Sequence, residues 1–196
     1  MNENEWDKIL KIRTTGRDDS NSDTYRYPYE PTSYDVLERL IRSGYIEKQN
    51  TVLDYGCGKG RVSLFLAFQT KCRSIGIEYD ERIFERALVN KESSSAGSRV
   101  QFVCSDAKVY DVPPEVDRIF FFNPFSVILL RSVLKKIYES YYESPRRILL
   151  MFYYPSAEYM DCLINESELT LVDEIDCGNL FKGSDERERI VVFGLG

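Results

Sequence analysis

The stretch TVLDYGCGKGR, residues 51–61, decides the fold of this chain. It starts with a short apolar run that has the length and composition of a buried strand. Glycine then occupies every second position, at Gly56, Gly58 and Gly60, which lets the backbone turn tightly and approach a bound molecule closely. The residues that follow open a helix, whose first N–H groups face the turn. The stretch therefore predicts a strand, a glycine turn and a helix, with a ligand-binding site at the turn.

Two charged residues indicate which kind of ligand this turn accepts. A G-x-G-x-x-G turn, which binds dinucleotides, would need its third glycine at position 61, where the sequence has Arg61. Asp54 stands at the mouth of the turn, where its carboxylate would repel a pyrophosphate and attract a cation. The turn therefore favours a cationic ligand over NAD.

Short apolar runs recur along the rest of the chain and predict an α/β fold. Seven runs have strand length, at 51–54, 74–77, 100–104, 118–122, 148–152, 169–175 and 190–193. Helical stretches are expected between the first five runs, and apolar stripes mark helices at 83–88, 130–141 and 159–164. This alternation predicts a mostly parallel sheet with helices on both faces. The last two runs are joined by a polar loop without room for a helix, which predicts an antiparallel pair.

The residues before the first run predict an N-terminal extension, 1–32, to a domain at 33–196. A short helix is expected around 6–10, followed by a polar link at 14–24. Two roles fit the tyrosines that come next: a lid over the ligand, which we favour, or packing against the edge of the sheet. These tyrosines are Tyr25, Tyr27 and Tyr29.

The composition excludes several kinds of site. The chain has no histidine, which excludes Ser-His and Cys-His nucleophile pairs and His-ligated metals. Its five cysteines form no C-x-x-C pair, and their apolar neighbours indicate buried thiols, so no metal site is expected. The net charge of −6 disfavours a nucleic-acid partner. No signal peptide and no membrane-length apolar run is found, so we expect a cytoplasmic protein without a membrane partner.

Two further acidic residues end the next two strands. Glu78 follows the run at 74–77, about 20 residues after the glycine turn, where it can accept hydrogen bonds from both ribose hydroxyls of a nucleoside. Asp106 follows the third run and can accept a hydrogen bond from an adenine amino group. Ligands of open α/β sheets bind at the carboxyl ends of the strands, so Asp54, Glu78 and Asp106 are predicted to line one site.

The pattern Asp54-x-Gly56-x-Gly58-x-Gly60, followed by Glu78 and Asp106, resembles the motifs of the Rossmann-like, class I S-adenosylmethionine-dependent methyltransferases over residues 50–195. S-adenosylmethionine carries a sulfonium and an ammonium group, which suit the charge of Asp54. The resemblance implies a Rossmann-like seven-stranded sheet whose last strand is antiparallel. It places the glycine turn near the methionine part, Glu78 at the ribose and Ala107 beside the adenine. The implied cofactor-binding residues are Asp54, Tyr55, Gly56, Cys57, Gly58, Gly60, Glu78, Asp106, Ala107 and Asn123.

The turn after the fourth run, Asn123-Pro124-Phe125, resembles the N-P-P-[FY] signature of methyltransferases that act on planar amino groups. The resemblance implies that the Asn123 side chain and the Pro124 carbonyl hold the amino group while Phe125 stacks on it. These three are therefore the predicted catalytic residues. The second proline of the signature is absent, and the alternative is a strand-to-helix turn in which Asn123 caps the helix.

These features predict an S-adenosylmethionine-dependent methyltransferase whose acceptor is a nitrogen of a small molecule or protein. Three alternatives remain open. The first is an enzyme that uses a related cofactor, such as an aminopropyl transferase, although the further acids expected around a polyamine cannot be placed. The others are a non-catalytic S-adenosylmethionine-binding module, and an NAD-dependent oxidoreductase, which Asp54 and Arg61 disfavour.

Overall fold

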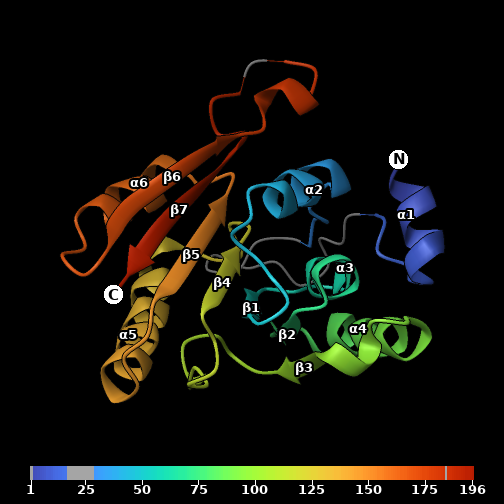
Figure 1. Cartoon of the computed structure of the whole chain (residues 1–196), viewed down its shortest axis with the longest axis horizontal. Coiled ribbons are helices and arrows are strands. Elements are labelled where there is room, and N and C mark those ends of the chain that lie inside the picture. Colours follow the sequence, from blue (N-terminus) through green and yellow to red (C-terminus); the bar gives the residue numbers. More distant parts are fainter. Residues whose placement is uncertain (1, 17–28, 184) are drawn as a thin grey trace.

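The computed structural model describes residues 2–16, 29–183 and 185–196. These residues form a seven-stranded sheet with the order β3-β2-β1-β4-β5-β7-β6 (Figure 1). Strand β7 is antiparallel to β5 and β6, and the other neighbouring pairs are parallel, which confirms the predicted sheet. The strands are β1 (Thr51–Tyr55), β2 (Arg73–Glu78), β3 (Val100–Cys104), β4 (Arg118–Phe121), β5 (Ile148–Tyr153), β6 (Thr170–Asp176) and β7 (Arg189–Leu195).

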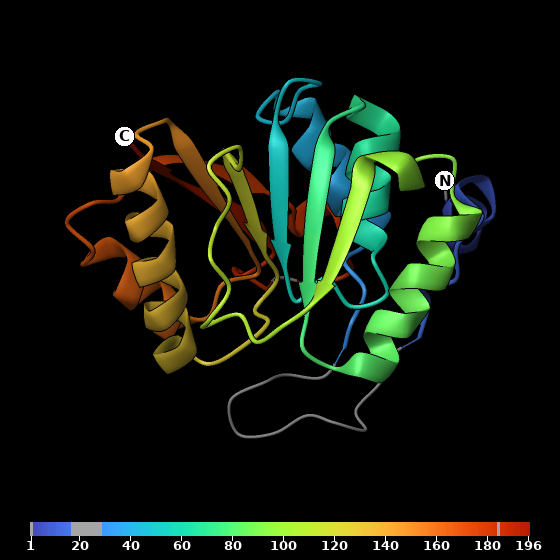
Figure 2. The same cartoon turned by 90° about the horizontal axis from the view of Figure 1, so that it is seen from below.

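Helices cover both faces of the sheet (Figure 2). Because successive strand residues point to opposite faces, Val52 and Phe120 enter the core under α1 to α4, whereas Leu53 and Ile119 enter the core under α5 and α6. The three helices predicted from apolar stripes are confirmed as α4, α5 and α6. The helices are α1 (Glu3–Leu10), α2 (Tyr34–Arg42), α3 (Arg61–Thr70), α4 (Glu81–Ser93), α5 (Val127–Glu143) and α6 (Ala157–Ile164), with 3-10 turns η1 (Gly97–Arg99) and η2 (Gly178–Leu180).

The segment between β3 and β4 differs from the prediction. A helical stretch was expected here, but residues 105–117 form turns and irregular structure. Pro113 and Pro114 lack backbone N–H groups and clash with the preceding turn of a helix, so they prevent one from forming across this segment. Val112 and Val116 are buried and attach the segment to the core under α5.

The described part of the N-terminal extension packs on the core. Helix α1, which confirms the short helix expected near the N-terminus, is capped by the side chain of Asn2. Trp6 and Leu10 are buried, and the Trp6 indole packs edge-on against the Phe65 ring of α3 with 4.9 Å between the ring centroids. Residues 2–12 therefore contribute to the same core as the sheet.

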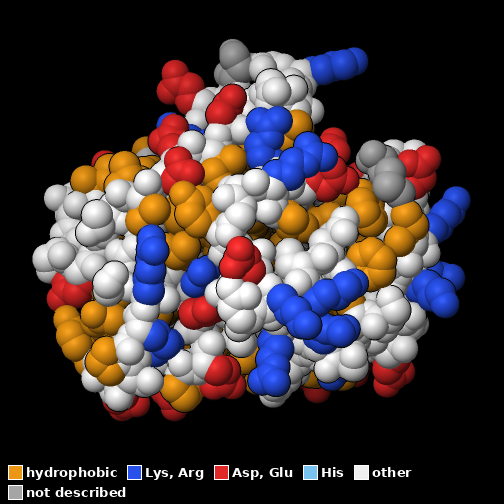
Figure 3. All heavy atoms as spheres, viewed as in Figure 1, with side chains coloured by type: hydrophobic (Ala, Val, Ile, Leu, Met, Phe, Trp, Pro, Cys, Tyr) orange, Lys and Arg blue, Asp and Glu red, His pale blue; other side chains and the backbone are white. Residues whose placement is uncertain are grey.

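The surface mixes charged and apolar side chains. Figure 3 shows Lys and Arg interspersed with Asp and Glu on the face that Figure 1 presents. Within the described parts of the chain, no helix has the length and apolar character needed to cross a membrane.

Cys104, at the end of the outermost strand β3, is exposed, whereas the other four cysteines are buried. The expectation of a buried thiol is therefore wrong at Cys104, because an outermost strand has a neighbour on one side alone.

Candidate active site

A cavity opens at the carboxyl ends of the four neighbouring strands β3, β2, β1 and β4. Each strand contributes one of the predicted polar residues to its lining: Asp106 after β3, Glu78 on β2, Asp54 on β1 and Asn123 after β4. The strand order reverses between β1 and β4, and a reversal of this kind is where open α/β sheets bind ligands. Including its open mouth the cavity has a volume of about 1060 Å³, which is enough for a nucleoside-sized ligand.

The glycine turn forms one wall of this cavity. The N–H groups of Gly56 and Cys57 both donate to the carbonyl oxygen of Ile77 at 2.9 Å, which ties the turn to β2. Gly56 has a φ of +73°, and a Cβ added there would lie 2.6 Å from the Cβ of Pro124. Glycine is therefore required by the backbone conformation and by the turn after β4, before any ligand is considered.

Asp54 is the most buried acid of the cavity, with 2% of its surface exposed. The hydroxyl of Ser63 on α3 donates to its carboxylate at 3.0 Å. Burial raises the pKa of Asp54 to about 7, and the nearby Glu78 adds to this rise, whereas the Ser63 hydrogen bond opposes it. A cation bound in the cavity would favour the ionised form of Asp54, so this acid and a cationic ligand stabilise one another.

Glu78 holds the tip of the glycine turn against β2. Its carboxylate accepts hydrogen bonds from the N–H groups of Gly58 at 2.9 Å, Tyr79 at 2.8 Å and Asp80 at 2.9 Å. Burial raises the pKa of Glu78, and these three hydrogen bonds oppose the rise. A carboxylate has about four lone-pair sites, so Glu78 can still accept a hydrogen bond from a ligand.

Most of the predicted cofactor-binding residues are brought together. Gly58 and Gly60 belong to the turn but are not part of the cavity lining, because Tyr29 and Phe102 occupy the space where their side chains would lie. Those on the lining are Asp54, Tyr55, Gly56, Cys57, Glu78, Asp106, Ala107 and Asn123. Within the described residues, no group of three or more Cys, Asp or Glu side chains is arranged to hold a metal ion.

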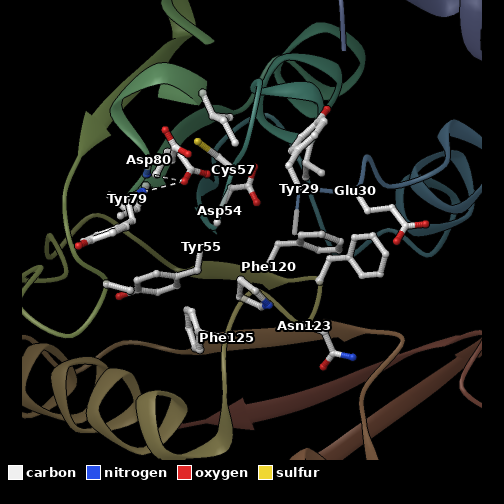
Figure 4. Close-up of a pocket in the computed structure, with 18 of the residues that line it drawn as sticks. Tyr29, Glu30, Asp54, Tyr55, Cys57, Tyr79, Asp80, Phe120, Asn123 and Phe125 are labelled. Atoms are coloured by element: carbon white, nitrogen blue, oxygen red, sulfur yellow. Dashed lines mark hydrogen bonds between the residues drawn. The ribbon is translucent and has the colours of Figure 1, made fainter. Parts of the chain in front are cut away.

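The turn after β4 holds Asn123 in a left-handed conformation, with a φ of +39°. Its side-chain N–H donates to the carbonyl oxygen of Tyr154 at 2.6 Å, and the amide points away from Asp54 (Figure 4). Its Oδ1 atom is buried and has no hydrogen-bond partner among the described residues. Helix α5 is preceded by Ser126 as its N-cap residue, so the alternative in which Asn123 caps the helix is wrong.

Pro124 and Phe125 also line the cavity. The Phe125 side chain is 4% exposed and packs edge-on against Tyr55 and Phe121, with 6.3 Å between the ring centroids in each pair. Its ring therefore belongs to the apolar wall of the cavity. The hydroxyl of Tyr159 donates to the Phe125 carbonyl oxygen at 2.6 Å and holds the turn in place.

Of the three tyrosines predicted to form a lid, Tyr25 and Tyr27 lie outside the described residues, and Tyr29 lines the cavity. The Tyr29 ring packs against Gly58, and its hydroxyl donates to the carbonyl oxygen of Thr14 at 2.6 Å. The Lys59 ammonium lies 4.5 Å from the centroid of the same ring. Tyr29 thus connects the N-terminal extension to the tip of the glycine turn.

Sequence reasoning missed several residues of the site, and Arg61 and Phe122 are two of them. Arg61 was used solely to exclude a dinucleotide, yet it lines the cavity and is 2% exposed. Its guanidinium donates to Thr14 Oγ1 at 2.7 Å, to the Thr32 carbonyl at 3.0 Å and to the Glu3 carboxylate. Phe122 was passed over as part of a strand, but it lines both this cavity and a neighbouring groove. Hydrophobic pattern alone could not separate Phe122 from the core phenylalanines before it.

The charge of the lining fits a cationic ligand. Arg61 is the one basic residue among the described residues that line the cavity, and its guanidinium is engaged by the N-terminal extension. The acidic side chains on the lining are Glu30, Asp54, Glu78, Asp80 and Asp106. A pyrophosphate would be repelled here, whereas a ligand with sulfonium and ammonium groups would be attracted.

Comparison with known proteins agrees with this geometry. A family model described as "Methyltransferase domain" matches residues 52–143. A protein-lysine N-methyltransferase from Saccharolobus islandicus is 31% identical over 78 residues, which are 39% of this chain and 48% of that protein. A tRNA1(Val) (adenine(37)-N6)-methyltransferase from Bacteroides fragilis is 35% identical over 65 residues, 33% of this chain and 27% of that protein. The chain thus spans less than half the length of these curated relatives.

Two solved structures share the fold over nearly their whole length. An RNA methyltransferase from Salinibacter ruber in complex with S-adenosyl-L-homocysteine has a TM-score of 0.54 at 20% identity, covering 85% of this chain and 92% of that one. A TehB-like SAM-dependent methyltransferase from Corynebacterium glutamicum has a TM-score of 0.59 at 16% identity, covering 98% and 94%. Because the relatives are named for protein and RNA acceptors, they do not support the expectation that nucleic acid is disfavoured. In its matched domain and in its fold, the chain is similar to the Rossmann-like, class I S-adenosylmethionine-dependent methyltransferases.

Proposed function

We propose that this chain transfers the methyl group of S-adenosylmethionine to a nitrogen atom of a small molecule or protein. The observation that carries the proposal is the cavity at the strand ends, where Asp54, Glu78, Asp106 and Asn123 come together from four neighbouring strands. Its acidic lining supports binding of a cationic nucleoside.

The cofactor would be held by the strand ends. When bound, S-adenosylmethionine supplies a methyl group on a positively charged sulfur, which a nucleophile can attack. Asp54 would attract the positive charge of the methionine part, and Glu78 would accept hydrogen bonds from the ribose. Asp106 and Ala107 would border the adenine. Because methyl transfer depends on proximity and orientation, these residues need to position the reactants rather than exchange protons with them.

The acceptor would be oriented by the turn after β4. The buried Asn123 Oδ1 has no partner among the described residues, which supports a role in accepting a hydrogen bond from a substrate N–H group. The Pro124 carbonyl can accept a second one. Two such acceptors would direct the nitrogen lone pair and offset positive charge as it develops on nitrogen. Phe125 would then serve as part of the apolar wall beneath the acceptor.

The N-terminal extension, 1–32, would cover the cofactor as a lid over the domain at 33–196. The proposal rests on Tyr29, because it is the one of the three predicted lid tyrosines that lies within the described residues. It lines the cavity and contacts the glycine turn. Water exclusion by such a cover would strengthen the electrostatic interactions inside the cavity.

The test is calorimetry with S-adenosylmethionine, S-adenosylhomocysteine and NAD, followed by detection of S-adenosylhomocysteine released with a panel of amines, proteins and RNA. We expect saturable binding of both sulfur compounds and turnover with a nitrogen acceptor. Tighter binding of NAD would overturn the cofactor assignment. Cofactor binding without turnover on any acceptor class would favour the non-catalytic binding module instead.

A further inference from the structure

A groove adjoins the cofactor cavity on the side of β5 and β7. Glu30, Pro31, Phe122 and Asn123 line both the cavity and the groove, so the two are continuous. The groove therefore gives a second molecule access to the side of the cavity where Asn123 lies.

Three aromatic side chains build one wall of the groove. The centroid of the Phe122 ring lies 4.8 Å from that of Tyr153 and 6.5 Å from that of Tyr154. The two tyrosine rings are 6.1 Å apart. Their planes are inclined to one another, at 43° for Phe122 with Tyr153 and 84° for Phe122 with Tyr154, so the wall is curved rather than flat. Aromatic faces arranged in this way attract cations.

This wall already holds one cation of the protein itself. The Arg187 guanidinium lies 4.3 Å from the centroid of the Tyr154 ring. Asp185 pairs with the same guanidinium at 2.9 Å and accepts a hydrogen bond from the Tyr154 hydroxyl at 2.6 Å. The charges of Asp185 and Arg187 therefore offset one another at the rim of the groove.

The carboxylate of Glu188 adds a negative charge to the groove. Glu188 accepts a hydrogen bond from the neutral Tyr153 hydroxyl at 2.7 Å, which orients its carboxylate without cancelling its charge. Glu30 lines the junction between the groove and the cavity. An aromatic wall together with a carboxylate is suited to an ammonium ion, and it is poorly suited to a phosphate-bearing molecule.

We propose that this groove binds the methyl acceptor as an alkylammonium group, with the cation on the Phe122, Tyr153 and Tyr154 wall and facing Glu188. The inference rests on the proposed methyltransferase function and specifies its substrate class as a primary or secondary alkylamine. Lysine side chains and small diamines share this chemistry.

The reaction balances without a further reactant. The ammonium ion first loses one proton, through Glu188 or to solvent, and becomes a neutral amine. The nitrogen lone pair then bonds to the methyl carbon while the carbon–sulfur bond breaks and its electron pair stays on sulfur. The products are an N-methylammonium ion and the neutral thioether S-adenosylhomocysteine, together with the released proton. The groove, which binds cations, suits both the substrate and the methylated product.

The acceptor class is tested on the full chain with saturating S-adenosylmethionine. The probes are a lysine-containing peptide, the same peptide with norleucine in place of lysine, 1,4-diaminobutane, and an adenine-rich RNA oligonucleotide. We expect S-adenosylhomocysteine release and a mass gain of one methyl group with the lysine peptide or the diamine, which distinguishes the two sources, and none with the other two. Methylation of RNA alone, or of no amine while the cofactor binds normally, would overturn the inference. Absence of cofactor binding would instead overturn the proposed function.

Two variants with matched controls test the groove itself. Glu188→Gln removes the carboxylate charge, and Phe122→Leu removes an aromatic face while keeping an apolar side chain. Each should raise the KM for the amine by about tenfold. Glu188 lines the groove and not the cofactor cavity, so Glu188→Gln should leave the dissociation constant of S-adenosylhomocysteine within about twofold. Glu186→Gln, an exposed acid of the same loop, and Tyr142→Leu, an exposed aromatic residue of α5, should leave both unchanged.

A conservative variant and an inhibitor keep the test independent of folding. Phe122→Tyr keeps an aromatic face and should restore the KM that Phe122→Leu raises. Tetramethylammonium, which is a cation without an N–H group, should inhibit competitively against the amine and not against S-adenosylmethionine. If Glu188→Gln and Phe122→Leu have the same KM for the amine as their two control variants, or if tetramethylammonium does not inhibit, the assignment of the groove would be overturned.

Discussion

The side-chain N–H of Asn123 donates to the carbonyl oxygen of Tyr154 at 2.6 Å, and both residues have a left-handed backbone, with φ values of +39° and +53°. The two residues follow the neighbouring strands β4 and β5, so this hydrogen bond ties two turns together at the junction of the cavity and the groove. Left-handed conformations cost non-glycine residues about 1 kcal/mol or more each, and they persist where surrounding contacts determine them. Non-glycine residues with a left-handed backbone are found more often at functional sites than elsewhere.

Replacing Asn123 should therefore affect turnover far more than cofactor binding. Asn123→Ala removes the buried Oδ1 acceptor and the anchor to Tyr154, and we expect turnover to fall by ~10²-fold. The affinity for S-adenosylhomocysteine should stay within about threefold, because the amide points away from Asp54. Steady-state kinetics and calorimetry measure the two quantities. Asn165→Ala, at an exposed asparagine whose side chain bonds to the Asp161 carbonyl, is the matched control. A parallel loss of affinity and turnover would contradict the prediction.

Glu78 should contribute directly to cofactor affinity. Glu78→Ala removes a charged acceptor from the cavity and also releases the N–H of Gly58, so the binding free energy should weaken by about 1–3 kcal/mol. Glu78→Gln keeps one oxygen for the turn and should weaken binding less. Titration calorimetry with S-adenosylmethionine gives both values. The exposed Glu85 of α4 supplies the control, since Glu85→Ala should not change the affinity; equal losses at both positions would argue against a ribose contact.

Asp54 should make both stability and binding depend on pH. Its folded-state pKa of about 7 lies above the usual 3.8, so the folded protein holds this proton more tightly than the unfolded chain does. The resulting stabilisation is complete below the usual pKa and is lost as pH rises through about 7. Urea unfolding without ligand, between about pH 5.5 and 8.5, should show this decline in the free energy of unfolding, and Asp54→Asn should lack it. Affinity for S-adenosylmethionine should have the opposite trend, falling as pH drops below about 7, because a cation prefers the ionised carboxylate.

Ser63 offers an independent check that Asp54 causes the pH dependence of cofactor binding. Its hydroxyl donates to Asp54 at 3.0 Å and stabilises the ionised form, so Ser63→Ala should raise the pKa of Asp54 further. The midpoint of the binding dependence on pH should then move to higher pH, whereas Ser63→Thr, which keeps the hydroxyl, should leave it close to that of the natural chain. A midpoint that does not move would show that another group controls the binding.

The glycine turn could be predicted from the sequence because its determinants are local. A strand, the alternating glycines and the following helix lie within twenty consecutive residues, and the acids Glu78 and Asp106 were placed by the rule that parallel strands end at one edge. The partners of Asn123 could not be predicted in the same way. Its bond to Tyr154 spans 31 residues and depends on how β4 and β5 pair.

The charged contacts of the N-terminal extension were equally inaccessible to sequence reasoning. The bond from Arg61 to Thr14 spans 47 residues, and nothing in the local sequence marks Arg61 as buried. Arginine is rarely buried unless it is paired, so a pattern-based analysis places it at the surface. The missing helix between β3 and β4 has a different cause, because the prolines at 113 and 114 override the expectation taken from strand–helix alternation.

Arg61 should be a major determinant of stability. Its guanidinium is 2% exposed, lies 4.3 Å from the centroid of the Tyr34 ring and joins α3 to the N-terminal extension through Thr14 and Glu3. Arg61→Met keeps the apolar stem but leaves the buried Asp7 without this cation, and we expect the free energy of unfolding to fall by about 3–5 kcal/mol.

Glu3, the carboxylate partner of Arg61, should contribute much less to the free energy of unfolding. Glu3 is 42% exposed, so water screens its interaction with Arg61, and Glu3→Gln should cost less than about 1 kcal/mol. Urea unfolding of the ligand-free protein measures both values, with Lys48→Met as the control at an exposed lysine. Limited proteolysis provides a second readout, because loss of Arg61 should expose the segment around α1 to cleavage before the rest of the chain unfolds. A cost for Arg61→Met as small as that for Lys48→Met would mean that the buried apolar contacts of Trp6 and Leu10 alone hold the extension on the domain.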